Sequence, residues 1–199
     1  MTIAIVDYGA GNLTSVKKAF DWLGHPSVIT SDPEVVRAAE KVVVPGVGHF
    51  AATASLDHRG LRQAIESAVQ RGRPLLGICL GMQWLFNSSS EATDVAGLGI
   101  FAGECVHFPA GVKSPHVGWN QLQRRGNSRI LAHLPPESFV YFTHSYRVPL
   151  VEQTVATCEY GGAFSAVVER ENVFGVQFHP EKSGHAGLHL LENFCALPC

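Results

Sequence analysis

The strongest constraint on the fold is the regular alternation of strand-like and helix-like segments in the first 87 residues. Short apolar runs rich in Val and Ile, typical of buried strands, occur at 2–8, 27–30, 41–46 and 74–78. Segments with helical spacing of apolar residues follow them at 12–23, 32–40, 60–71 and 80–86. Strands that alternate with helices form βαβ units, so the sequence predicts a doubly wound, mostly parallel α/β sheet flanked by helices.

The pattern changes in the second half of the chain. Segments 138–146, 154–160, 164–170 and 173–178 have strand composition without intervening helices, and helical spacing returns only at 184–197. This predicts an added antiparallel section. No internal repeat, low-complexity tract or linker interrupts the 199 residues, which suit a single domain over 1–199.

Composition excludes several classes of function. With 15 Lys and Arg against 17 Asp and Glu, the net charge of −2 offers no basic surplus for nucleic acid. The apolar runs are too short to span a bilayer, and the first residues lack the basic segment of a signal peptide. Five cysteines without a C-x-x-C pair argue against a disulfide framework or a zinc site, so we expect no metal and a cytoplasmic location.

One of these cysteines, Cys79, lies between Gly77 and Gly81 in the sequence GICLG, where the pattern switches from strand to helix. Nucleophiles at sharp strand-to-helix turns need small flanking residues, as in the G-x-S-x-G elbow of hydrolases. Such a turn leaves the thiol partly exposed at a helix N-terminus, where the helix dipole favours the reactive thiolate. The alternative is a core cysteine beside unrelated glycines.

A catalytic cysteine needs a base, and among ten histidines His179 stands out. It follows a predicted strand, and Glu181 comes two residues later, on the same side of extended backbone. Pro180 stiffens the link between them. A carboxylate beside an imidazole fixes its tautomer and stabilises the imidazolium. The alternative is a solvated His and Glu in a strand-end turn.

Acyl transfer also needs hydrogen-bond donors for an oxyanion. The N–H of Leu80, directly after the nucleophile, is one candidate. The other is the N–H of Val47, in the strand-end sequence PGVG, where Gly46 and Gly48 would let the peptide reorient at low steric cost. An ordinary strand-to-helix turn would use the same glycines.

Together, GICLGMQ, PGVG and FHPEKSG resemble the class I glutamine amidotransferases, whose triad matches Cys79, His179 and Glu181. The further motifs DYGAGNLTSV, PHVGWN and FTHSY make the chain similar to the glutaminase subunits of imidazole glycerol phosphate synthase. This resemblance runs from about residue 3 to residue 195. It implies glutamine hydrolysis without a cofactor.

The resemblance also implies which residues bind substrate and partner. The substrate residues would be Gly46, Gly48, Gln83, His144, Ser145 and Tyr146. The partner would be a (βα)8-barrel cyclase that receives ammonia, and it would contact Asn12, Ser15, Trp119 and Lys182. Core packing is the alternative for Trp119, and ordinary exposed residues are the alternative for Gln83 and Lys182.

The residues also leave other functions open. The chain could be the glutaminase subunit of another amidotransferase, or it could be a catalytically silent regulatory module. The intact Cys-His-Glu set argues against a loss of catalytic activity. A stand-alone cysteine hydrolase or a redox-sensing protein would not need GWN or the KSG that follows Glu181.

Overall fold

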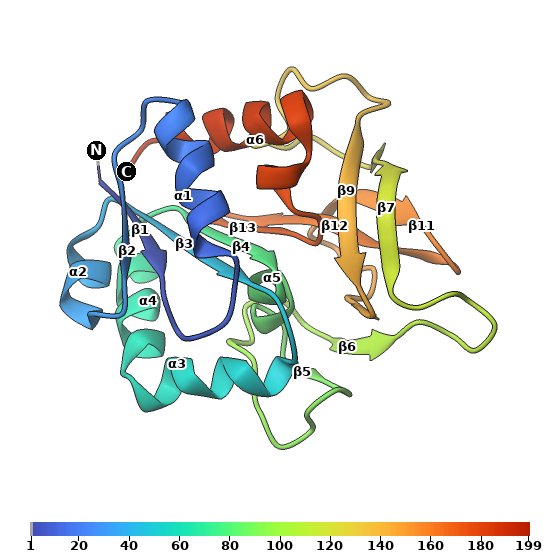
Figure 1. Ribbon diagram of the computed structural model, residues 1–199, viewed down its shortest axis with the longest axis horizontal. Helices are drawn as coiled ribbons and strands as arrows, with labels where there is room; N and C mark the ends of the chain where they lie inside the picture. The colour runs from blue at the N-terminus through green and yellow to red at the C-terminus, as the bar shows by residue number, and fades with distance from the viewer. Residues whose placement is uncertain (1) are drawn as a thin grey trace.

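The computed structural model describes residues 2–199, and its centre is an eight-stranded sheet covered by helices on both faces (Figure 1). The strands follow the order β2-β1-β3-β4-β13-β12-β11-β8. The first five are parallel, and the last three continue the sheet in antiparallel fashion. Their bounds are β1 (Ile3–Val6), β2 (Ser27–Thr30), β3 (Lys41–Gly46), β4 (Leu75–Cys79), β8 (Gln123–Arg124), β11 (Thr154–Glu159), β12 (Ala163–Arg170) and β13 (Val173–Val176). The predicted α/β class and antiparallel addition are confirmed.

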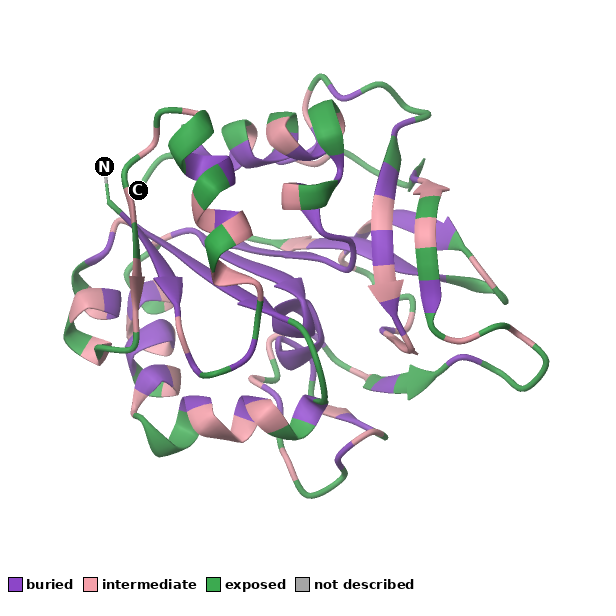
Figure 2. Cartoon of the chain, in the orientation of Figure 1, coloured by how far each residue is buried: buried purple, intermediate pink, exposed green. Residues whose placement is uncertain are grey.

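The helices divide between the two faces of the sheet (Figure 1). One face carries α1 (Leu13–Trp22) and α6 (Gly184–Ala196), and the other carries α2 (Pro33–Ala38), α3 (Ala54–His58), α4 (Leu61–Gln70) and α5 (Leu80–Trp84). Two separate apolar clusters result, and Figure 2 shows the central strands almost entirely buried between them. Strands buried on both faces explain why the first half reads as continuous apolar runs. No helix in residues 2–199 is both long and apolar enough to cross a bilayer.

Two smaller sheets lie beside the main one. A ribbon of two antiparallel strands, β7 (His116–Gln121) and β9 (Phe139–His144), lies next to the end of the parallel strands (Figure 1). The other sheet joins β5 (Ser88–Ser89), β6 (Glu104–His107) and β10 (Tyr146–Arg147). The sequence HVGWNQ of β7 was not among the predicted strands, because its two apolar residues, Val117 and Trp119, are separated by a glycine and followed by polar residues with low strand preference. Its pairing with β9 overrides that weak local preference.

The helices begin with different local contacts. Asn12 holds the N-cap position of α1, but its side chain makes no capping hydrogen bond. Asp32 does cap α2, by accepting from the N–H of Glu34 at 2.8 Å. The short turns η1 (Phe50–Thr53) and η2 (Pro180–Lys182) and helix α3 were not predicted. Such short elements carry too little periodicity to be recognised in a sequence.

The elbow between β4 and α5 has the strain that the GICLG sequence suggests. Cys79 has a φ of 53°, a conformation that non-glycine residues rarely adopt and that costs on the order of 1–3 kcal/mol. A Cβ on Gly81 would lie 1.8 Å from the carbonyl oxygen of Val44, and one on Gly77 would lie 2.8 Å from the backbone of Gly81. Both glycines are therefore required by close backbone contact.

This contact predicts a difference between two glycine substitutions. Gly81→Ala forces β3 and α5 apart and should lower the free energy of unfolding by about 3 kcal/mol, the upper part of the usual range for overpacking. Gly126→Ala is the matched control, because a Cβ there meets no atom within 4 Å, and it should change stability by less than about 0.5 kcal/mol. Urea unfolding measures both, and equal stabilities of the two variants would contradict the close-packing argument.

Candidate active site

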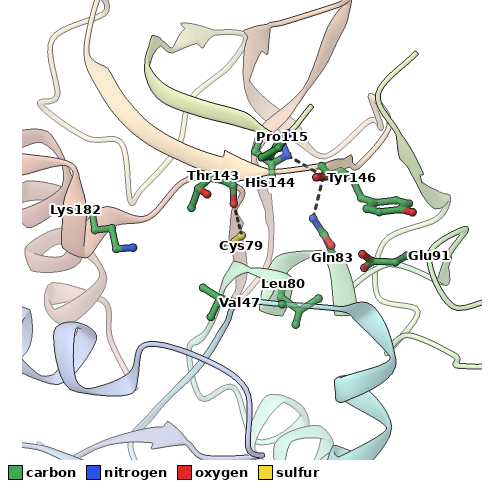
Figure 3. A pocket seen from close by; sticks show the side chains of 12 residues that line it. Val47, Cys79, Leu80, Gln83, Glu91, Pro115, Thr143, His144, Tyr146 and Lys182 are labelled. Atoms are coloured by element: carbon green, nitrogen blue, oxygen red, sulfur yellow. Dashed lines mark hydrogen bonds between the residues drawn. The ribbon is translucent and has the colours of Figure 1, made fainter. Parts of the chain in front are cut away.

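A pocket of about 440 Å³ opens over the elbow, where the parallel strands end and the β7–β9 ribbon approaches (Figure 3). Open parallel sheets place ligand sites at the carboxyl ends of their strands. The residues that line it are Val47, Gly48, Cys79, Leu80, Gln83, Glu91, Pro115, Thr143, His144, Ser145, Tyr146 and Lys182. Eight residues that we expected at the oxyanion, substrate or partner positions are among them, together with the predicted nucleophile.

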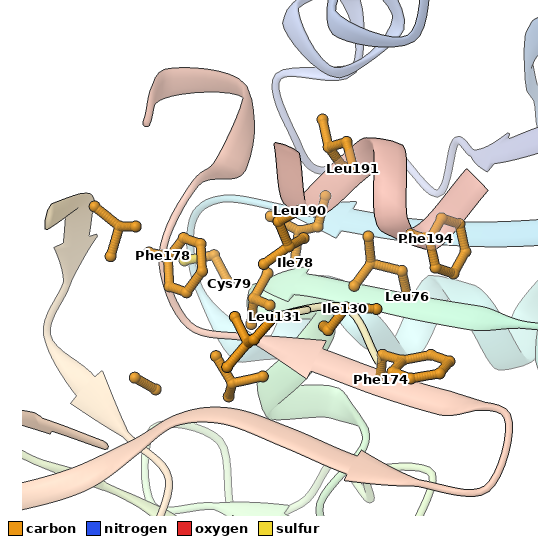
Figure 4. Close-up of a cluster of buried hydrophobic side chains, with 14 of the residues drawn as sticks. Leu76, Ile78, Cys79, Ile130, Leu131, Phe174, Phe178, Leu190, Leu191 and Phe194 are labelled. Carbon is orange, nitrogen blue, oxygen red and sulfur yellow. The ribbon is translucent and has the colours of Figure 1, made fainter. Parts of the chain in front are cut away.

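Cys79 lies at the floor of this pocket but is more buried than the elbow motif suggested. Its exposed fraction is 5%, because its outer side is covered by the ribbon and its inner side packs on a cluster that includes Ile78, Phe178 and Leu190 (Figure 4). The expectation of a partly exposed thiol is therefore wrong for this structure. The polar neighbours of the sulfur include the carbonyl of Thr143 at 3.9 Å and the side-chain amide of Gln177 at 3.7 Å, in addition to His179.

His179 and Glu181 form a buried pair next to Cys79. Nδ1 of His179 lies 2.9 Å from Oε1 of Glu181, and the two side chains are only 2% and 1% exposed. Glu181 reaches the ring from the η2 turn that begins at Pro180, rather than from extended backbone as expected. The other ring nitrogen, Nε2, is buried and makes no hydrogen bond within residues 2–199. It is thus free to exchange a proton at the nucleophile, and catalytic hydrogen bonds often close only when substrate is bound.

The charges around His179 favour its protonated form. Burial lowers its pKa, but the Cys79 thiolate and then the Glu181 carboxylate outweigh burial and raise the pKa from 6.5 to about 10. These neighbours therefore favour the imidazolium form of the ring. Since the folded-state pKa is raised, this charge stabilises the fold fully below about pH 6.5 and progressively less as the pH rises through about 10.

Ser183 holds the catalytic turn against the ribbon. Its hydroxyl donates to the carbonyl of His179 at 2.7 Å and accepts from the N–H of Tyr141 at 2.9 Å. The N–H of His179 in turn donates to the carbonyl of Tyr141 at 2.9 Å. These bonds attach β9 to the HPE turn, so that Thr143 and His144 reach the pocket. The serine of KSG is therefore a structural part of the site.

The two proposed oxyanion donors lie on adjacent backbone segments. Gly46 pairs in register with Cys79 across β3 and β4, so Val47 and Leu80 each follow directly after this pair. Val47 is 37% exposed at the pocket, whereas Gly46 is buried and does not line it. A Cβ on Gly46 would lie 2.1 Å from the hydroxyl of Tyr8 and 2.9 Å from Cβ of Leu80, so only glycine fits there.

One wall of the pocket is a chain of neutral polar groups from the ribbon. Nδ1 of His144 donates to the carbonyl of Tyr146 at 2.8 Å, and Nε2 of His144 lies 3.2 Å from Nδ1 of His116. Burial lowers the pKa of His144 to about 3 and that of His116 to about 4, so both rings are neutral at physiological pH. Gln83 also donates from Nε2 to the carbonyl of Tyr146, at 3.0 Å (Figure 3).

Two residues of the site, Glu91 and Gln177, were not predicted from the sequence. Glu91 lines the pocket opposite Lys182, and one of its oxygens accepts from the N–H of Phe50 at 2.7 Å (Figure 3). It comes from a polar loop, and nothing in the loop sequence distinguishes it from a solvated carboxylate. Gln177 had a usable signal, because it lies two residues before His179 at a strand end and so faces the same side.

The residues expected at a partner surface do not all lie in the pocket. Lys182 lines it, and Ser15 lines a neighbouring groove together with Glu181. Asn12 is half-buried before α1. Trp119 is 56% exposed, so core packing, the alternative reading of this side chain, is wrong. Its ring lies edge-on to that of Tyr141, on the outer face of the ribbon.

Comparison with known proteins agrees with this geometry. The family model for glutamine amidotransferase class-I matches residues 4–197. A solved glutamine amidotransferase, 20% identical, superposes with a TM-score of 0.76 over 97% of this chain and 99% of its own. PurLQS from Thermotoga maritima, 19% identical, gives a TM-score of 0.75 over 98% and 97%. The chain belongs to the class I glutamine amidotransferases.

Closer relatives narrow the assignment. Imidazole glycerol phosphate synthase subunit HisH of Moorella thermoacetica is 51% identical over 195 residues, which cover 96% of this chain and 93% of the relative. The HisH subunit of Aquifex aeolicus is 48% identical over 198 residues, with 98% and 96% covered. Within its family, the chain therefore belongs to the HisH subunits.

The charge analysis predicts how His179 titrates. Cys79→Ser removes the thiolate that raises the pKa of His179, so the midpoint of its imidazole titration, followed by NMR, should fall well below the native value of about 10. Cys158→Ser, a change at another buried cysteine that is not among the groups raising the pKa of His179, should leave that midpoint unchanged. If the midpoint is the same in Cys79→Ser as in the native chain, the thiolate is not what raises it.

Proposed function

We propose that this chain is the glutaminase subunit of an imidazole glycerol phosphate synthase and acts in histidine biosynthesis. It hydrolyses L-glutamine to glutamate and ammonia with Cys79 as nucleophile, His179 as acid and base, and Glu181 as the group that orients His179. The observation that carries this proposal is the buried His179–Glu181 pair beside a cysteine at a strained elbow, all at the floor of one pocket.

The protonation state of His179 suits the first half of the reaction. The Cys79 thiolate attacks the carboxamide carbon of glutamine, and the N–H groups of Val47 and Leu80 hold the oxyanion that forms. The His179 imidazolium gives its proton to the departing nitrogen, which leaves as ammonia, and a thioester remains on Cys79. Neutral His179 then takes a proton from water, which attacks the thioester and releases glutamate and the thiolate.

The pocket walls suit the amino-acid end of glutamine. Glu91 supplies a carboxylate for the α-ammonium group, and Gln83 keeps a carbonyl oxygen without a hydrogen-bond partner in the described part of the chain. His144, Ser145 and Tyr146 form the facing wall, and Gly48 leaves room for the substrate beside Val47. Because both imidazoles of this wall are neutral, they do not repel the α-ammonium group.

The outer face of the ribbon is the surface that we propose for the cyclase partner, a (βα)8 barrel. Val117, Trp119 and Phe139 are each more than half exposed, and they lie on the same strands that bring Thr143 to Cys79. Exposed apolar groups of this size mark interaction surfaces. Asn12, Ser15 and Lys182 extend the contact, and ammonia released at Cys79 passes to the partner, which makes imidazole glycerol phosphate and aminoimidazole carboxamide ribotide.

Labelling and substitution at Cys79 test the activity. An electrophilic glutamine analogue should modify the Cys79 peptide, and Cys79→Ser should abolish glutamine hydrolysis in the complex while ammonia-dependent cyclase activity persists. Cys158→Ser is the matched control and should keep both activities. Normal glutamine use by Cys79→Ser would overturn the triad, and absence of labelling with the partner bound would indicate a silent module.

Trp119→Ala tests the partner surface. Removing a large aromatic anchor from an interface typically costs 2 kcal/mol or more, about 30-fold in the dissociation constant for the cyclase. Val28→Ala is the control, because Val28 is also an exposed apolar residue but lies on β2, at the opposite edge of the main sheet. Calorimetric titration measures both, and a loss for Val28→Ala as large as that for Trp119→Ala would contradict a partner surface on the ribbon.

A further inference from the structure

A fully buried glutamine outside the predicted triad contacts the nucleophile. Gln177 has no exposed surface, and both ends of its side-chain amide lie near residues of the active site. Its Oε1 lies 3.3 Å from Nε2 of Gln83, and its Nε2 lies 3.7 Å from Sγ of Cys79. A buried amide is costly unless its polar atoms are paired, so these two contacts need a reason.

The direction of these hydrogen bonds follows from one backbone carbonyl. The oxygen of Tyr146 can only accept, so the atom of Gln83 that lies 3.0 Å from it must be the donor Nε2. The atom of Gln177 that faces this same Nε2 must then be its acceptor, Oε1. Nε2 of Gln177 is left pointing at the sulfur, so Cys79 receives an N–H donor rather than a carbonyl oxygen.

We propose that Gln177 is a positioning residue for the nucleophile, which donates a hydrogen bond to the Cys79 thiolate and is held in that orientation by Gln83. The inference rests on the proposed function, because it assigns Gln177 a role in the same reaction. Hydrogen bonds to charged groups are stronger than those between neutral groups, so the donor favours the thiolate over the thiol. It also fixes the sulfur from the side of β13.

The same arrangement links substrate binding to the nucleophile. Gln83 uses its nitrogen on Tyr146 and Gln177, so only its Oε1 remains for a ligand. A substrate that moves Gln83 therefore also changes the acceptor that orients Gln177. Of the other groups near the sulfur, the Thr143 oxygen is an acceptor, and the His179 ring gives its proton away during the reaction, so the Gln177 amide is the donor that stays on the sulfur throughout.

Two substitutions that keep the approximate size of Gln177 test the role of its N–H donor separately from that of the rest of the side chain. Gln177→Glu keeps an oxygen for Gln83 but places an acceptor against the sulfur, and Gln177→Met removes both polar atoms. In the complex with the cyclase, each should lower kcat for glutamine hydrolysis about 10- to 100-fold, the range for one hydrogen bond to a charged group, with KM little changed. Gln63→Glu, at an exposed position of α4, is the control for the added charge and should retain native rates.

A second readout distinguishes positioning from a purely structural role. Mass spectrometry of the Cys79 peptide measures the rate at which iodoacetamide alkylates Cys79 as a function of pH. This rate should reach half its maximum at a higher pH in both Gln177 variants than in the native complex. Native kcat in both variants, or reduced kcat with an unchanged alkylation profile, would overturn the proposal. Activity of Cys79→Ser would instead overturn the proposed function, whatever the Gln177 variants do.

A measurement on the unsubstituted glutamine covers the case in which the variants fail to fold. The chain is labelled with ¹⁵N-glutamine, and the side-chain amide resonance of Gln177 is assigned by its absence from Gln177→Asn spectra or by triple-resonance methods. This resonance should shift when Cys79 is alkylated. The Gln63 amide is the internal control and should not move. A Gln177 amide that does not respond to alkylation of the sulfur would show that the hydrogen bond is absent.

Discussion

The contact between the backbone of Gly81 and the carbonyl of Val44 is the constraint on which the active site depends. It presses the start of α5 onto β3, and the chain can then leave β4 only through the strained conformation of Cys79. The same contact places Gly46 beside Cys79 in register, so both proposed oxyanion donors follow at one edge of the sheet. The strain at Cys79 is tolerated because the central strands and the helix faces packed against them are buried.

The second half of the chain completes the site by closing over this elbow. Strand β13 enters the parallel sheet next to β4 and brings Gln177 and His179 to the sulfur from one side. The ribbon arrives from the other side, held by Ser183 and by the carbonyl of Tyr146, which accepts from two directions. The groups of the proposed chemistry, a thiolate, an imidazolium and a fixed amide, thus come from segments about 100 residues apart.

Much of this arrangement could be predicted from short-range patterns. The strand and helix alternation predicts the parallel core, and the glycines around Cys79 predict the elbow, because steric limits act within a few residues. His179 and Glu181 could be paired because they are two residues apart. Strand β7 could not be predicted, because HVGWNQ becomes a strand only through pairing with β9. Glu91 could not be recognised either, because its loop has no signal beyond one carboxylate.

The sequence by itself determined the class of fold, the elbow and the pairing of His179 with Glu181, since these follow from backbone sterics and the periods of 2 and 3.6 residues. Only the tertiary structure decided how deeply Cys79 is buried, that Glu181 reaches His179 from a turn, and that the amide of Gln177 faces the sulfur. Those properties depend on which distant segments pack together. The direction of a buried hydrogen bond is set by its partner, and that partner is not adjacent in the chain.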